Sequence, residues 1–177
     1  MYKSLGILLI FIAIIANPEI GNADSKIRVV CTTGMITDIV REVAAEHASV
    51  RGLMKSGIDP HLYRATRSDV ALLNSADVVF YNGLLLEGKM SDALVRVASA
   101  GRKVFAVTEL IPTDFLLEPA EFAGHYDPHV WMDPVAWGSA VKVVSNRLQQ
   151  IDPAHATFYQ QNSSIYLEKI SKLHQAA

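Results

Sequence analysis

The tripeptide Asp-Pro-His occurs twice in the chain, as Asp59-Pro60-His61 and as Asp127-Pro128-His129, and an aromatic residue, Tyr63 or Trp131, follows each histidine two positions later. A neutral imidazole is a versatile ligand for transition metals. The proline fixes its own φ angle and favours an extended backbone at the aspartate before it. Each copy therefore predicts a stiff loop that presents one histidine, as a metal site requires.

Four carboxylates in or near these loops have competing roles. Asp59 and Asp127 could orient the two imidazoles or only cap turns. For Asp133 we predict the turn role. Glu87 is expected near the same rim, where it would serve the site or stand in the first turn of a helix.

The remaining histidines offer no third ligand. His125 lies four residues before His129, but the intervening proline disfavours the helix that would align them, so we regard it as a bystander. His47 ends a predicted helix, where its ring suits the helix dipole. His155 and His174 are expected to be solvated on the last helix. The sequence also lacks an HExxH motif, a paired-cysteine motif, a nucleophile elbow and a glycine-rich phosphate loop, so we predict no enzyme.

Strand-like and helix-like patterns alternate along the chain, which predicts an α/β fold: one lobe with a mostly parallel four-stranded sheet flanked by helices, followed by a long C-terminal helix. Loops after parallel strands meet at one rim, so His61, after the second strand, and His129, after the fourth, should lie within about 8 Å of each other. Strands are expected at 27–31, 50–54, 77–81 and 103–107, and helical patterns at 36–44, 86–97, 137–148 and 153–177.

The first 23 residues resemble a secretory signal peptide. Lys3 precedes an apolar run over 5–16, and Gly21-Asn22-Ala23 suits cleavage after Ala23. The run is short for a membrane anchor, which is the alternative. No cysteine follows it closely, so no lipid attachment is expected, and the lone Cys31 is predicted to be a buried apolar residue. We predict a periplasmic or extracellular location.

The formal net charge of −2, from 16 basic and 18 acidic residues, disfavours a nucleic-acid partner. Residues 24–152 are long enough for one domain with its own core. The last helix, 153–177, carries Phe158, Ile165, Ile170 and Leu173 on a broad apolar face, which we expect to be only partly covered.

Several motifs, in order along the chain, resemble those of bacterial solute-binding protein family 9, the periplasmic zinc, manganese and iron receptors of ABC importers. The resemblance extends over essentially all of the chain after residue 23. The matching segments are 32–36 (TTGMI), 57–63 (GIDPHLY), 68–70 (SDV), 74–77 (NSAD), 82–87 (NGLLLE) and 127–134 (DPHVWMDP).

The resemblance implies two α/β lobes joined by a long rigid helix, with the metal between them. The first lobe supplies two histidines, which match His61 and His129. The second lobe supplies a His or Glu and an Asp, and we expect both that lobe and these ligands to be absent here, since the sequence ends inside what resembles the linking helix. The implied cargo is Mn²⁺ or Zn²⁺, with Fe²⁺ as a further candidate, and the implied partner is an importer permease, bound by a monomer.

Two other functions remain open on the sequence. One is a small metallohydrolase that uses His61 and His129 with Asp59 or Glu87, which would need a water-activating carboxylate and a substrate pocket. The other is an adhesin-like surface protein.

Overall fold

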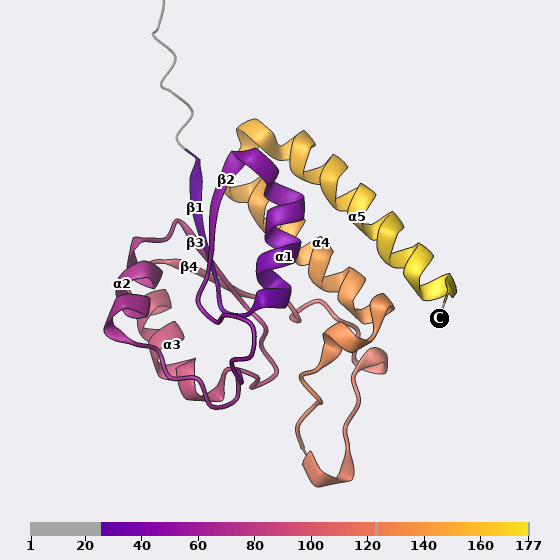
Figure 1. Ribbon diagram of the computed structural model, residues 1–177, viewed down its shortest axis with the longest axis horizontal. Coiled ribbons are helices and arrows are strands. Elements are labelled where there is room, and N and C mark those ends of the chain that lie inside the picture. The colour runs from indigo at the N-terminus through magenta and orange to yellow at the C-terminus, as the bar shows by residue number, and fades with distance from the viewer. Residues whose placement is uncertain (1–25, 123, 177) are drawn as a thin grey trace, which may run out of the picture.

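The computed structural model describes residues 26–122 and 124–176, so the expected signal peptide, 1–23, lies outside the described residues (Figure 1). The described part has an α/β fold, as predicted. Its strands are β1 (Ile27–Cys31), β2 (Ala48–Gly52), β3 (Val78–Tyr81) and β4 (Lys103–Ala106). Its α-helices are α1 (Gly34–Ala44), α2 (Arg67–Ser75), α3 (Ser91–Ser99), α4 (Pro134–Ile151) and α5 (Ala156–Ala176).

The four strands form one parallel sheet in the order β2-β1-β3-β4, which confirms the predicted sheet. β2 begins two residues before the expected start. Its register explains this, because Ala48 is paired with Ile27 at the start of β1. The N–H groups of Leu53 and Met54 still donate to carbonyls of the β1 segment at 2.9 Å, so hydrogen bonding continues past the end of β2.

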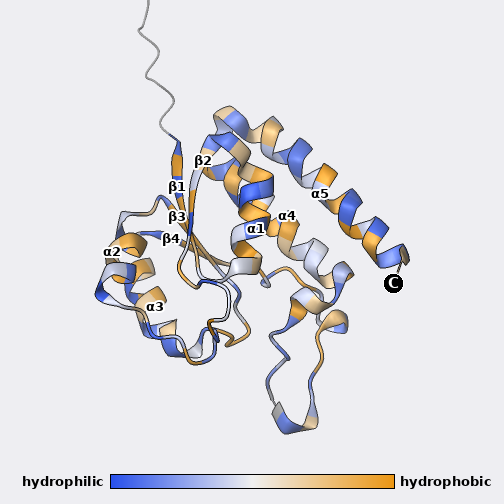
Figure 2. Cartoon of the chain, viewed as in Figure 1, coloured by the Kyte–Doolittle hydropathy of each residue, from blue (hydrophilic) through white to orange (hydrophobic). Residues whose placement is uncertain are grey.

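Helices cover both faces of the sheet (Figure 1): α1, α4 and α5 lie on one side, and α2 and α3 on the other. Successive residues along a strand point to opposite faces of the sheet, so they belong to two different hydrophobic cores. Val29 and Phe80 belong to the core beneath α1 and α4, whereas Val30 and Val79 belong to the core beneath α2 and α3. Burial on both faces explains the apolar runs of the two central strands, residues 29–31 in β1 and 78–80 in β3, whereas the edge strand β2 is largely exposed. Figure 2 shows orange on the central strands and blue on the outer face of the helices.

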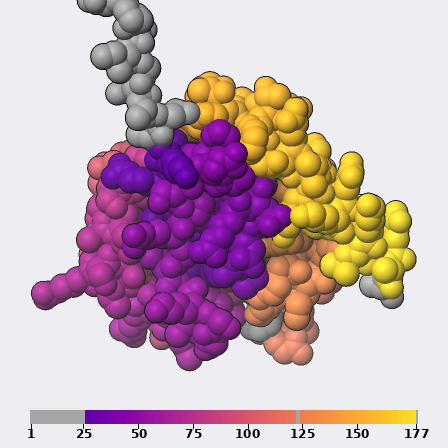
Figure 3. All heavy atoms as spheres, turned by 45° about the horizontal axis from the view of Figure 1, so that its top comes forward, coloured from indigo at the N-terminus to yellow at the C-terminus, as the bar shows by residue number. Residues whose placement is uncertain are grey.

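The long C-terminal helix is also present. A 3-10 turn, Pro153–His155, precedes α5, which therefore begins at Ala156 and not at Pro153. α5 packs on α4 and α1, and its C-terminal half projects at the edge of the molecule (Figure 3). Ile165 is 54% exposed and Leu173 is 63% exposed, so the apolar face is only partly covered, as predicted.

The turn before α5 corrects one expectation. His155 is not solvated: its ring stacks on His47 with centroids 3.9 Å apart, and its Nδ1 lies 2.8 Å from Asp152 Oδ2. Asp152 occupies the N-cap position, but its carboxylate accepts a hydrogen bond from the Tyr159 hydroxyl at 2.5 Å in place of a capping bond. Burial would raise the pKa of Asp152, but the bonds from Tyr159 and His155 outweigh it and lower the pKa. His174 is exposed, as expected.

None of the helices in the described part of the chain is long and apolar enough to span a membrane.

Candidate metal centre

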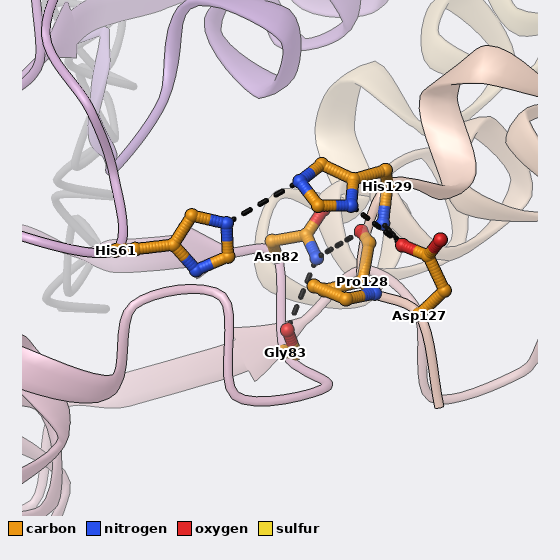
Figure 4. A network of polar contacts seen from close by, with 6 residues as sticks. All are labelled: His61, Asn82, Gly83, Asp127, Pro128 and His129. Atoms are coloured by element: carbon orange, nitrogen blue, oxygen red, sulfur yellow. Dashed lines mark hydrogen bonds and ion pairs between the residues drawn. The ribbon is translucent and has the colours of Figure 1, made fainter. Parts of the chain in front are cut away.

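The two Asp-Pro-His loops meet at the carboxyl-terminal edge of the sheet. His61 follows β2 and His129 precedes α4, and their Nε2 atoms lie 3.3 Å apart (Figure 4). The ring planes are inclined by 58°, with centroids 5.3 Å apart. The predicted proximity of the two imidazoles is therefore confirmed.

The separation of the two nitrogens suits a shared ion. Two nitrogens bound to a tetrahedral zinc ion at about 2.05 Å each lie roughly 3.35 Å apart. The observed separation of 3.3 Å matches this distance. Both side chains are exposed, so an ion would also have room for ligands from outside this pair.

The aspartate of each loop makes the same turn contact. Asp59 Oδ1 accepts a hydrogen bond from the His61 N–H at 2.9 Å, and Asp127 Oδ1 accepts one from the His129 N–H at 2.9 Å. Asp127 Oδ1 also lies 2.5 Å from Nδ1 of the His129 ring. The His129 backbone N–H and then its ring hold the pKa of Asp127 below its usual range.

Asp127 therefore has both of the roles considered for it: it caps the turn and it orients the imidazole of His129. Nε2 of His129 is then directed at His61 (Figure 4). Within the described residues, Asp59 has the turn role but no bond to a ring. Asp133 caps α4, since its Oδ1 accepts from the N–H groups of Val135 and Ala136 at 2.7 and 3.3 Å, as predicted.

The aromatic residues after the two histidines have different roles. The Trp131 ring packs edge-on against the His129 ring, with centroids 5.2 Å apart. The Tyr63 hydroxyl donates to Asp69 Oδ2 at 2.8 Å, and burial, then this bond, raises the pKa of Tyr63 to about 12. Because Asp69 also forms a capping box with Thr66 at the start of α2, Tyr63 anchors the His61 loop to that helix.

Asn82 and Glu87 link the His129 loop to the sheet, a role that the sequence did not reveal. Asn82 follows β3, and its Nδ2 donates to the carbonyl of Pro128 at 3.1 Å. Glu87 is 3% exposed and accepts from Thr32 Oγ1 at 2.6 Å and from the N–H groups of Asn82 and Gly83 at 2.7 and 3.3 Å. Its burial raises its pKa.

Glu87 therefore lies near the rim, as expected, but its side chain is buried and links the ends of β1 and β3 by hydrogen bonds. The hydrogen bonds that Glu87 accepts from Thr32, Asn82 and Gly83 give it a structural role, and Asp59 makes no bond to either ring within the described residues. Gly83, two residues after the end of β3, has φ +90°, a left-handed conformation that favours glycine.

The site brings together two candidate ligands, His61 and His129. Within residues 26–122 and 124–176, no group of three or more His, Cys, Asp or Glu side chains could hold a metal ion. His125 is exposed, in keeping with its reading as a bystander. Any further ligands would have to come from water or from outside the described residues.

Residues 29–177 match the profile of the ZnuA family, described as zinc-uptake complex component A, periplasmic. The chain belongs to this family. It is 42% identical over 153 residues to the zinc-binding protein TroA of Treponema pallidum, covering 85% of this chain and 48% of TroA. It is 38% identical over 152 residues to the manganese-binding lipoprotein MntA of Bacillus subtilis, covering 86% of this chain and 49% of MntA.

The solved structure of the periplasmic zinc-binding protein TroA from Treponema pallidum superposes with a TM-score of 0.79 at 40% identity, over 84% of this chain and 52% of that one. The chain thus spans about half the length of the ZnuA-family relatives it matches. These relatives are named as metal-binding proteins and not as enzymes. The comparisons favour neither the hydrolase nor the adhesin alternative.

Proposed function

We propose that this ZnuA-family chain binds a divalent transition metal, Zn²⁺ or Mn²⁺ with Fe²⁺ as a further candidate, through His61 and His129. The metal is cargo, captured in the periplasm and delivered to the permease of an ABC importer. The observation that carries the proposal is the 3.3 Å separation of the two Nε2 atoms, with one ring braced by Asp127. The relatives named for zinc and for manganese support the choice of metals.

The proposal includes a division of the chain. Residues 24–152 form the metal-binding lobe, and α5, within 153–177, takes the place of the linking helix. The signal peptide over 1–23 remains a prediction, as does the monomeric state. The transport role predicts that genes for an ATPase and a permease adjoin the gene of this protein.

Two imidazoles alone predict weak binding. A four-ligand structural zinc site contributes roughly 10–16 kcal/mol, so half of its ligands would supply about 5–8 kcal/mol, which corresponds to a Kd between roughly 1 and 200 µM. Zinc should bind more tightly than manganese, because imidazole sites follow the Irving–Williams order where geometry imposes no selection.

Calorimetric titration of the chain with Zn²⁺ and with Mn²⁺ tests this proposal, beside His61→Ala, His129→Ala and the control His174→Ala. The control removes an exposed histidine on α5 that makes no hydrogen bond or ring contact with either member of the pair among the described residues. We expect zinc binding to be lost in the first two variants and retained in the control. Nanomolar binding by the chain, or binding that survives both substitutions, would show that the ligands lie elsewhere.

A further inference from the structure

The peptide unit between Pro128 and His129 is held at both ends. Asn82 Nδ2 donates to its carbonyl oxygen at 3.1 Å, and Asp127 Oδ1 accepts from its N–H at 2.9 Å (Figure 4). The plane of a peptide unit sets the direction of the side chain that follows it, because its rotation changes φ of the next residue. Holding both polar groups of this unit therefore fixes where the imidazole of His129 points.

Asn82 is itself fixed in place. Its N–H donates to Glu87 Oε1 at 2.7 Å, and its carbonyl accepts from Thr108 Oγ1 at 2.7 Å. The side chain is fully buried and also donates to the carbonyl of Gly83 at 3.0 Å. One end of the Asn82 carboxamide faces two carbonyl oxygens, which can only accept hydrogen bonds. That end is therefore the NH₂ group, Nδ2.

The carboxamide oxygen of Asn82 has no hydrogen-bond partner among the described residues. A buried polar atom without a partner lowers stability. A residue that served the turn alone would need only the local bond to Gly83. The bond to Pro128 instead joins segments 46 residues apart in sequence and ends on the peptide that carries a proposed ligand.

We propose that Asn82 is a positioning residue for metal capture: it orients His129 by holding the Pro128 carbonyl, and so sets the affinity and the coordination geometry of the site. This inference rests on the proposed function, since it takes His129 to be a ligand. Asn82 does not touch the metal and acts through the His129 loop.

The test compares Asn82→Ala and Asn82→Asp with the control Asn162→Ala. Asn162 on α5 makes the same kind of bond, from Nδ2 to the carbonyl of Val43 at 3.1 Å, remote from the histidine pair. The second variant keeps the volume of the side chain but replaces the donor with an oxygen that repels the Pro128 carbonyl. Zinc affinity, the visible absorption spectrum of bound Co²⁺ and the urea midpoint are measured for each full-length chain.

We expect both Asn82 variants to bind zinc roughly 10-fold or more weakly, the effect typical of residues that orient metal ligands, and to change the Co²⁺ spectrum, which reports coordination geometry. Asn162→Ala should lower only the urea midpoint. Wild-type zinc affinity and an unchanged Co²⁺ spectrum in the Asn82 variants would overturn the inference, and so would failure of both variants to fold.

The result for His129→Ala separates the two proposals. If zinc binding is lost in His129→Ala but kept in both Asn82 variants, the positioning role alone is wrong. If zinc binding survives His129→Ala, the proposed ligand set is wrong and the role of Asn82 falls with it.

Discussion

Replacing Glu87 with alanine would leave two buried donors, Thr32 Oγ1 and the N–H of Asn82, and one half-buried donor, the N–H of Gly83, without their acceptor. The threonine hydroxyl can rotate to another acceptor, but the two backbone N–H groups cannot. An unsatisfied buried donor costs about 1–3 kcal/mol, which applies to the N–H of Asn82, and the half-buried N–H of Gly83 costs less because water reaches it. Burial already disfavours the charged carboxylate, so its removal offsets part of this loss. We expect a net loss of about 1–3 kcal/mol in the free energy of unfolding.

Urea unfolding at pH 7, followed by far-ultraviolet circular dichroism, measures this loss. The matched control is Glu109→Ala, which removes a carboxylate that pairs with Arg147 at the surface at 2.5 Å. Surface ion pairs contribute about 0–1 kcal/mol, so the control should change little. A loss for Glu87→Ala no larger than that of the control would refute the reasoning, because it would show that the strand ends at β1 and β3 do not depend on this carboxylate.

Two further predictions concern the carboxylates of the site. The variant Asp127→Asn keeps an acceptor for the His129 N–H but loses the charge that faces the ring, so its Kd for zinc should rise roughly tenfold. The calorimetric control is Asp133→Asn, because asparagine is an equally good helix cap. Equal zinc affinities in the two variants would contradict the prediction. Because burial raises the pKa of Glu87 above its usual 4.5, the folded chain holds that proton more tightly than the unfolded chain. The stability advantage of wild type over Glu87→Gln, taken as the difference between their free energies of unfolding, should therefore fall as the pH rises from 4.5. Urea unfolding of both proteins from pH 4 to 7 measures this difference. A difference that does not change with pH would exclude a raised pKa for Glu87.

The strands and the two histidines could be predicted because their signals are local. The buried central strands show apolar runs, such as residues 78–80 in β3, and loops after parallel strands reach one rim. The family resemblance added the candidate metals and the expected importer partner. None of this required knowledge of which strands are neighbours.

The parts that were missed depend on long-range pairing or on weak patterns. Helix α2 has few buried residues, so it shows little amphipathic pattern, although the Thr66-to-Asp69 capping box was a readable signal. The role of Glu87 follows from the sheet order, which places the end of β1 beside the end of β3. A single sequence does not reveal that order. His155 looked solvated because its stacking partner, His47, lies 108 positions earlier in the chain.

The two loops, alike in sequence, do not prepare their histidines equally. The ionised carboxylate of Asp127 can only accept, so Nδ1 of a neutral His129 carries the proton and its Nε2 is a free lone pair. In that tautomer of His129, the 3.3 Å contact is a hydrogen bond when His61 donates from its own Nε2. Under the proposed function, a metal ion would then have to displace this bond, worth about 1 kcal/mol, and His61 would have to move its proton to Nδ1. The proposal therefore implies that His129 presents its lone pair before the metal arrives, whereas His61 would do so only on binding.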